Sequence, residues 1–235
     1  MGTIQRTPIE NHLLAALPDL QRRRMLARCD SVDLAFGDVL YRPLEPLVHV
    51  YFPLRASISL VMPMDDSDSV EVGLVGREGM FGIPLALGVP TSPVRAVVQG
   101  GGTSLRMDAT AFCRELARSP ALRQEVDRYV YVHVSQLAQA VGCTRFHLVE
   151  ARLARWLLMT QDRAHADSFH ITHQFLAVML GVRRVGVTKA ASSLQKRNLI
   201  HYSRGHITVL DRVGLKAASC TCYKADRISY AQTLS

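Results

Sequence analysis

The hydrophobic pattern between residues 172 and 200 predicts two short helices, each with its apolar residues on one face. Gly181 separates them, and a glycine there can take the positive φ that often ends a helix. Two helices joined by such a tight turn are typical of a helix-turn-helix. The apolar positions are Phe175, Leu176 and Met179 in the first helix and Val187, Ala190, Ala191 and Leu194 in the second.

Residues 200–210 change to an alternating pattern. Ile200 and Tyr202 precede the turn Arg204-Gly205, and Ile207 and Val209 follow it. Apolar residues at every second position on both sides of a glycine-containing turn predict a β-hairpin. A hairpin directly after a helix-turn-helix indicates a winged helix.

The first half of the chain has a different pattern. Residues 11–29 predict two short helices broken near Pro18, with Asn11 as the N-cap of the first. From about Ser31 the chain becomes rich in β-forming residues, with strands expected within 32–43, 47–64 and 69–76 and at 95–99 and 103–107. No helical crossover separates these strands, so they predict an antiparallel barrel or jelly roll and an α+β protein.

The pattern turns helical again from Asp108. A short helix is expected through Leu116, and Ser119-Pro120 then opens a long one. Along the long helix, apolar positions follow one another at spacings of 4, 3, 4 and 3, which is a heptad seam. Such a seam either covers the barrel or pairs with a second copy of the chain. Pairing is attractive because dimers of helix-turn-helix proteins in general place their second helices about one turn of DNA apart. The seam residues are Val126, Val130, His133, Leu137 and Ala140, with His133 interpreted as a packed side chain.

Gly142 and Cys143 are expected to interrupt this helix and act as a hinge. A further helix then resumes, a polar loop is expected at 164–168, and the tail after about Tyr223 is polar and expected to fray. The predicted division is therefore 1–118 for a sensor-like β-roll, 119–142 for the dimerisation helix and hinge, and 143–223 for the winged helix-turn-helix. The inward side chains expected on the resumed helix are Leu148, Leu153, Trp156, Leu157 and Met159.

Charge is distributed unevenly along the chain. The window 143–216 holds 12 Lys and Arg against 4 Asp and Glu, whereas the rest of the chain holds 16 of each. The whole formal charge of +8 therefore lies on the segment with the helix-turn-helix. Because binding to duplex DNA depends on neutralising phosphates, this asymmetry indicates a DNA-binding module.

Several other classes of protein fit poorly. No apolar run approaches the ~20 residues of a membrane span, and the first residues show no secretory signal pattern, so we expect a cytoplasmic protein with no membrane partner. The five cysteines predict reduced thiols, and Cys220 and Cys222, the only close pair, are too close for a common metal knuckle. His49 is the only histidine between residues 31 and 107, which argues against a cupin-like metal enzyme, since that needs several clustered ligands. No pairing of a nucleophile with a base is visible either.

The order of barrel, long helix and winged helix-turn-helix resembles the Crp/Fnr family of bacterial transcription regulators. The resemblance spans nearly the whole chain and is carried by VYFP at 50–53, VEVGLVGREGMFG at 70–82, SPVRAVVQ at 92–99, EARLARWLL at 150–158 and the block 172–200. It implies a cyclic-nucleotide-binding-like jelly roll, a homodimer and action on RNA polymerase. It also implies three readers of base edges, Arg184, Val185 and Lys189, and phosphate contacts from Thr172, Gln174, Arg183, Thr188, Ser203 and Arg204.

In the barrel the chain departs from the cyclic-nucleotide-binding members. Where they carry a glycine-glutamate pair for the ribose, this chain has Gly79-Met80-Phe81-Gly82, and Ser92-Pro93 replaces their arginine-serine clamp for the cyclic phosphate. With Arg95 nearby, these stretches mark the candidate effector pocket, but an unpaired phosphate there would be costly to bury, so cyclic AMP is not expected. The N-terminal cysteine cluster of the iron-sulfur branch is also absent, and we predict no cofactor.

The sequence therefore predicts a homodimeric, sequence-specific transcription regulator whose barrel either binds an unidentified small-molecule effector or is purely structural. The rival interpretation is a ligand-sensing β-roll without DNA-binding function.

Overall fold

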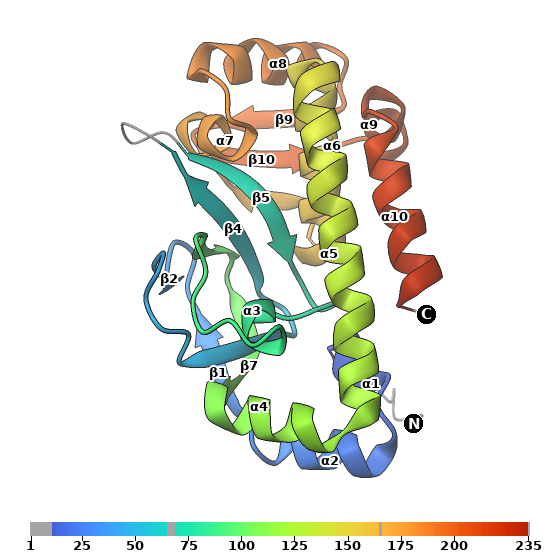
Figure 1. The fold of residues 1–235 in the computed structure, drawn as a ribbon. Coiled ribbons are helices and arrows are strands. Elements are labelled where there is room, and N and C mark those ends of the chain that lie inside the picture. The colour runs from blue at the N-terminus through green and yellow to red at the C-terminus, as the bar shows by residue number, and fades with distance from the viewer. Residues whose placement is uncertain (1–10, 65–68, 165, 235) are drawn as a thin grey trace, which may run out of the picture.

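The structure is a computed structural model that describes residues 11–64, 69–164 and 166–234. A β-barrel occupies one end of the molecule and a helical domain with a small sheet occupies the other (Figure 1). Helix α5, Pro120–Phe146, runs along much of the molecule's length, and the C-terminal helix lies beside it. This arrangement places the barrel and the helical domain in contact with the same long helix.

Two short helices precede the barrel, as the sequence predicts. They are α1, His12–Ala15, and α2, Asp19–Leu26, and they are separated at Pro18. The Asn11 side chain caps α1 by accepting a hydrogen bond from the Leu14 backbone N–H. It is also held in place, because its amide donates to the carbonyls of Pro53 and Gly79. The cap therefore ties the N-terminal helices to the barrel.

The barrel consists of two antiparallel sheets, which confirms the predicted jelly-roll architecture. One sheet has the strand order β1-β7-β3 and the other β2-β6-β4-β5, and every pairing is antiparallel. Large apolar residues such as Phe52, Ile58 and Val98 are fully buried in the barrel. The strands are β1 Asp30–Leu34, β2 Val39–Tyr41, β3 His49–Pro53, β4 Ser57–Pro63, β5 Ser69–Val75, β6 Arg95–Gly100 and β7 Gly102–Asp108.

Three helices complete this half of the molecule. Helix α3, Ile83–Ala86, follows β5, and α4, Ala109–Arg118, begins at the predicted cap, where the Asp108 carboxylate accepts from the Ala111 N–H. Ser119 caps α5 in the same way by accepting from the Leu122 N–H. Both helix starts confirm the sequence prediction.

The predicted interruption of α5 at Gly142 and Cys143 is wrong. The helix continues through both residues to Phe146 and breaks at His147 and Leu148, before α6, Val149–Ala164. A single glycine costs a helix only about 1 kcal/mol, which packing of the neighbouring turns can offset. Leu148, expected to face inward, lies outside both helices and is exposed.

The heptad seam of α5 faces the chain's own barrel. Val126 is fully buried, Val130 packs against the same apolar cluster, and His133 and Leu137 line a cavity beside the barrel. Val130, His133, Leu137 and Ala140 are half-buried, so the seam lies at the edge of the contact with the barrel, and its pairing with a second copy stays a prediction. Of the two roles that the pattern left open, contact with the barrel is the one visible within a single chain.

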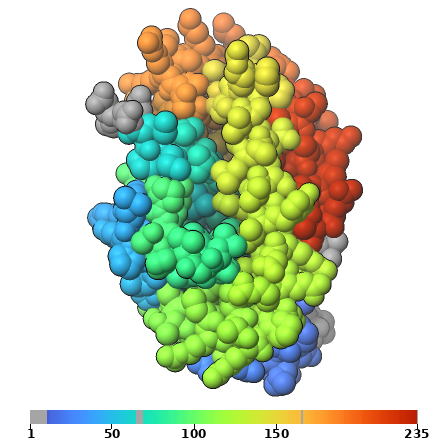
Figure 2. All heavy atoms as spheres, viewed as in Figure 1, coloured from blue at the N-terminus to red at the C-terminus, as the bar shows by residue number. Residues whose placement is uncertain are grey.

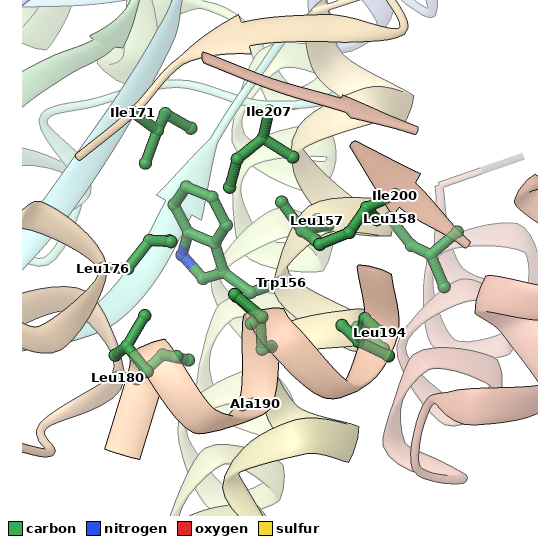
Figure 3. Packing of buried hydrophobic residues seen from close by; sticks show 14 of the residues in the cluster. Trp156, Leu157, Leu158, Ile171, Leu176, Leu180, Ala190, Leu194, Ile200 and Ile207 are labelled. Carbon is green, nitrogen blue, oxygen red and sulfur yellow. The ribbon is translucent and has the colours of Figure 1, made fainter. Parts of the chain in front are cut away.

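The helical domain forms around Trp156 of α6, which lies at the centre of its apolar cluster (Figure 3). Ile171, Leu176, Leu180 and Ala190 surround the indole ring. The domain contains α7 His173–Leu180, α8 Arg184–Lys196, β9 Ile200–Ser203 and β10 His206–Val209, as predicted. A third strand, β8 Ser168–His170, pairs with β10 beyond the predicted loop.

The prediction of a frayed C-terminal tail is wrong. The chain continues as α9, Arg212–Ala218, and α10, Cys222–Thr233, which packs on α5 and α6. Tyr223 and Asp226 are buried in this contact. The sequence of the tail is polar because α10 packs through charged and hydroxyl groups. A search for apolar periodicity does not detect burial of such groups.

Among the described residues, no helix is long and apolar enough to cross a membrane.

Candidate nucleic-acid interface

The turn between α7 and α8 is built as the sequence indicates. The Thr172 hydroxyl caps α7 by accepting from the Phe175 N–H at 3.1 Å, and Gly181 ends the helix with a φ of 60°. The backbone N–H of Val182 then donates to the carbonyl of Ala177 at 3.0 Å, which closes the turn. The second helix therefore leaves the first at a fixed angle, with its buried face on Trp156 and its other face in solvent.

All nine residues of the predicted DNA contact set are exposed. Arg184, Val185, Thr188 and Lys189 lie in the first half of α8, and Arg183 is its N-cap. Val185 is 59% exposed although it is apolar, so it does not contribute to the core. The other exposed members are Thr172, Gln174, Ser203 and Arg204.

The cations on this face differ from the other basic residues of the domain. Arg155, Arg163 and Arg212 form ion pairs with acidic residues of the same chain, at nitrogen to oxygen distances between 2.5 and 2.8 Å. In the part of the chain that the structure describes, no ion pair includes Arg183, Arg184, Lys189 or Arg204. Fewer positive charges are therefore available for phosphates than the count of Lys and Arg in this domain suggests. Those that remain are concentrated on α8 and the hairpin.

The hairpin between β9 and β10 turns at the predicted pair. Arg204 and Gly205 both have positive φ, 48° and 81°, as the two central residues of a type I′ turn require. Glycine takes such angles without strain, whereas Arg204 is less suited to them. The turn directs the Arg204 side chain into solvent beside Ser203, at the end of the wing.

His173, which the sequence analysis did not identify, connects the three elements of this face. Its ring stacks on Tyr202 of β9, with centroids 4.1 Å apart, and its Nδ1 lies 3.1 Å from the Thr188 hydroxyl of α8. Burial and the nearby Arg184 lower the pKa of His173, which favours the neutral ring at pH 7. In the sequence, the only indication of this role is the position of His173 at the start of the first predicted helix, and that indication is weak.

The barrel and the helical domain share a polar contact. The Trp156 indole N–H donates to Glu71 of β5 at 3.0 Å, and Ser59 donates to the other carboxylate oxygen at 2.6 Å. Burial raises the pKa of Glu71 to about 7, although both hydrogen bonds oppose this. Gln99 of β6 also donates to Thr160 of α6 at 2.9 Å. These hydrogen bonds connect strands of the barrel directly to α6.

The predicted effector pocket is only partly brought together. Met80, Phe81, Gly82, Ser92 and Pro93 line a cavity of about 260 Å³ between the barrel and α5, where His133 and Leu137 close it. Gly79 and Arg95 are not part of the lining. Gly79 packs against the Tyr129 ring instead, and Arg95 is exposed.

The lining of this cavity is mostly apolar. Among the described residues around it none carries a formal charge at pH 7, since burial lowers the pKa of His133 and so favours its neutral form. A charged phosphate would therefore find no positive partner in this cavity.

Comparisons with known proteins fit this architecture. Residues 151–218 match the family model of the Crp-like helix-turn-helix domain. No curated protein matches the chain significantly. Three solved structures of low identity are similar over most of the chain. A CRP/FNR-family transcriptional regulator from Thermus thermophilus is 21% identical, with 81% of this chain and 98% of that chain covered and a TM-score of 0.67. FixK2 from Bradyrhizobium japonicum is 13% identical (82% and 98% covered, TM-score 0.69), and the c-di-GMP responsive global regulator CLP from Xanthomonas campestris is 16% identical (82% and 99% covered, TM-score 0.67).

At these identities the solved structures show a shared fold, and the family model locates the helix-turn-helix. Both findings agree with the resemblance seen in the sequence. Residues 151–218 are therefore a Crp-like helix-turn-helix domain, and the chain shares the fold of solved Crp/Fnr-family regulators along most of its length.

Proposed function

We propose that the protein is a sequence-specific transcription regulator that places α8 in the major groove of DNA. One observation carries this proposal: the exposed half of α8 and the wing present their unpaired cations on adjacent elements, which His173 holds together through Tyr202 and Thr188. Backbone contacts fix the register of such a helix, and contacts to base edges select the sequence. RNA polymerase, whose work a promoter-bound regulator assists or blocks, is the second proposed partner.

Within this interface we assign different roles to neighbouring residues. Arg184 and Lys189 can donate to the O6 and N7 acceptors of guanine, and exposed Val185 offers an apolar contact to a thymine methyl group. Val185 cannot accept a hydrogen bond from cytosine, so the preferred site differs from that of relatives with an acidic residue there. The proposed phosphate contacts are Thr172, Gln174, Arg183, Thr188, Ser203 and Arg204.

We further propose that two copies pair through the outer side of α5, which is uncovered along the visible face of the molecule (Figure 2). Tyr131, Val134 and Val141 are 64%, 57% and 71% exposed, and exposed Ala138 lies between them. Their spacings of 3, 4 and 3 form a heptad stripe, displaced by one residue from the seam that faces the barrel. A two-fold dimer through this stripe would present two α8 helices to successive half-sites about 34–36 Å apart.

The proposed boundaries follow from this arrangement. Residues up to 118 form the sensor-like barrel, α5 is the dimerisation helix, and the DNA-binding domain begins at α6. Helix α10 spans the boundary because it packs on both α5 and α6.

The cavity beside α5 is the proposed effector site. Its lining favours an uncharged, mostly apolar small molecule, because the described lining residues offer no cation. Cyclic AMP and the dinucleotide to which the similar Xanthomonas regulator responds are anions, and neither fits this lining. An effector here would contact both the barrel and α5, and it can shift the two α8 helices only by preferring one arrangement.

Replacing Arg184 tests the DNA interface. After selection of genomic fragments identifies the preferred site, we expect Arg184→Ala to lose about 1–3 kcal/mol of binding free energy and to relax the preference at one base pair. Arg183→Ala should weaken all sequences equally and lower the salt slope by about 1. Titrations of the preferred site and of point-mutated sites measure both effects.

Arg114→Ala is the matched control, because it removes an exposed cation of α4 at the far end of the molecule and should leave binding unchanged. If Arg184→Ala weakened every sequence equally, the assigned register of α8 would be incorrect. If the unmodified protein showed no salt-dependent binding to any fragment, the sensing-module interpretation would replace this proposal.

A charge in the exposed stripe tests the dimer. We expect Val134→Glu to be monomeric, since burying two unpaired carboxylates in the interface costs several kcal/mol. Val213→Glu, which alters an exposed valine of α9, should leave the mass unchanged. Sedimentation equilibrium measures both; dimers of unchanged affinity in Val134→Glu would place the interface elsewhere.

A further inference from the structure

Four side chains that can bind a metal meet where α5, α6 and α10 join. Cys143 lies in the last turn of α5 and His147 is its C-cap, whereas Cys220 lies between α9 and α10 and Cys222 is the first residue of α10. One ligand atom from each residue can be chosen so that all four lie within 4.8 Å of one another. In the sequence, Cys220 and Cys222 are too close together for a common metal knuckle and have no second close pair beside them. The fold supplies that second pair from a position about 75 residues earlier in the chain.

Two separations within the cluster are close to those of a tetrahedral zinc site. Bond lengths of about 2.3 Å to sulfur and 2.0–2.1 Å to nitrogen put neighbouring ligand atoms roughly 3.6–3.8 Å apart. Here the sulfurs of Cys143 and Cys220 are 3.6 Å apart, and the Cys222 sulfur is 3.4 Å from His147 Nδ1. These two pairs form opposite edges of the tetrahedron. Three sulfurs and a histidine nitrogen gathered in one place are a more specific signal than a thiol pair alone.

The surroundings also suit a metal with thiolate ligands. The three cysteines are buried, and His147 is half-buried. The Gln139 amide donates to the Cys222 sulfur at 2.9 Å, as groups around bound thiolates commonly do. Three thiolates and one imidazole around Zn²⁺ leave one net negative charge, and the nearby guanidinium groups of Arg152 and Arg155 interact electrostatically with Cys143. The pocket is therefore protected from water and offers positive charge to a Cys₃His zinc centre.

We propose that Cys143, His147, Cys220 and Cys222 bind one structural Zn²⁺ ion that fastens α10 to the junction of α5 and α6. All four coordination positions are filled by protein, as in structural and unlike catalytic zinc sites. The ion would hold His147 at the break between the two helices, which sets the direction of α6 and hence of the helix-turn-helix. This site does not depend on the proposed DNA interface.

Zinc content tests the proposal directly. We expect the full-length protein, purified with a thiol reductant and passed through a chelating resin, to retain about one zinc per chain. Cys222→Ser and His147→Ala should retain little or none, whereas Cys113→Ser and Cys29→Ser, which alter thiols outside the cluster, should keep the full amount. Cobalt substitution should give thiolate-to-cobalt charge transfer and the strong visible bands of tetrahedral Co²⁺, and both should disappear in the Cys222→Ser protein.

The cobalt measurement on the unmodified protein keeps the test valid even if a variant fails to fold. Protein that takes up neither zinc nor cobalt under reducing conditions would overturn the proposal. So would metal that is retained in Cys222→Ser and His147→Ala, since it would then lie on other side chains. Recovery of a Cys143–Cys220 disulfide in reductant-free protein that takes up no metal after reduction would assign the cluster to redox chemistry instead.

Discussion

Replacement of Gly79 with alanine is expected to cost about 3 kcal/mol or more of unfolding free energy. A Cβ at this position would lie 2.0 Å from Cε2 and Cζ of Tyr129 and 2.4 Å from its hydroxyl oxygen. The ring cannot withdraw, because Tyr129 is among the largest fully buried side chains and anchors α5 on the barrel. Either the loop that carries Gly79 or the long helix must therefore move.

Urea unfolding of the two proteins at the same concentration measures this effect as a lower midpoint with a similar slope. Gly142→Ala is the control, since a Cβ there meets no atom within 4 Å and the residue lies inside α5. It should stabilise the protein by up to about 1 kcal/mol. Equal stability of Gly79→Ala and the unmodified protein would show that the Tyr129 ring is not fixed against the barrel loop.

The behaviour of Gly79 illustrates which features the sequence can predict. Local signals were reliable: the caps at Asn11 and Thr172, and the turn at Arg204 and Gly205, depend on a few neighbouring residues. The glycine-rich stretch that includes Gly79 was assigned to an effector pocket by resemblance alone. Its contact with Tyr129 joins residues fifty positions apart, and no local pattern contains that information.

Helix α5 shows a second limit of pattern reading. It carries two heptad stripes one residue apart, and both are apolar enough to form a seam. In the first stripe Val126 is buried and the other members are half-buried, whereas Val134 and its neighbours in the second stripe are exposed. Which stripe meets a second copy is decided by where the barrel lies, and tertiary structure alone supplies that. The count of basic residues overstated the charge available for DNA for the same reason. Arg155 and Arg163 form ion pairs within the chain, with Asp226 and Glu78, and so are not available to phosphates.

The sequence pattern did not predict α10, because this helix packs through polar groups. Its ion pair with α6 is expected to have a large effect on stability. The Asp226 carboxylate accepts two hydrogen bonds from Arg155 of α6, at 2.6 and 3.0 Å, and both side chains are largely buried. Burial raises the pKa of Asp226, although the guanidinium opposes the shift. Asp226→Ala would leave the Arg155 charge without its partner, and we expect a loss of about 3–5 kcal/mol.

Two further variants separate this explanation from a simple loss of packing. Asp127→Ala removes an exposed carboxylate of α5 that lies 4.0 Å from Arg123, and it should change stability by no more than about 0.5 kcal/mol. In the double variant Arg155→Met with Asp226→Leu neither charge remains, so most of the lost stability should return, as apolar replacements of buried pairs often allow. Hydrogen exchange of the α10 amides would reveal whether the helix detaches before the rest of the molecule unfolds. If the double variant were as unstable as Asp226→Ala, the stranded charge would not be the cause, and the contribution of α10 would have to come from its other contacts with α5 and α6.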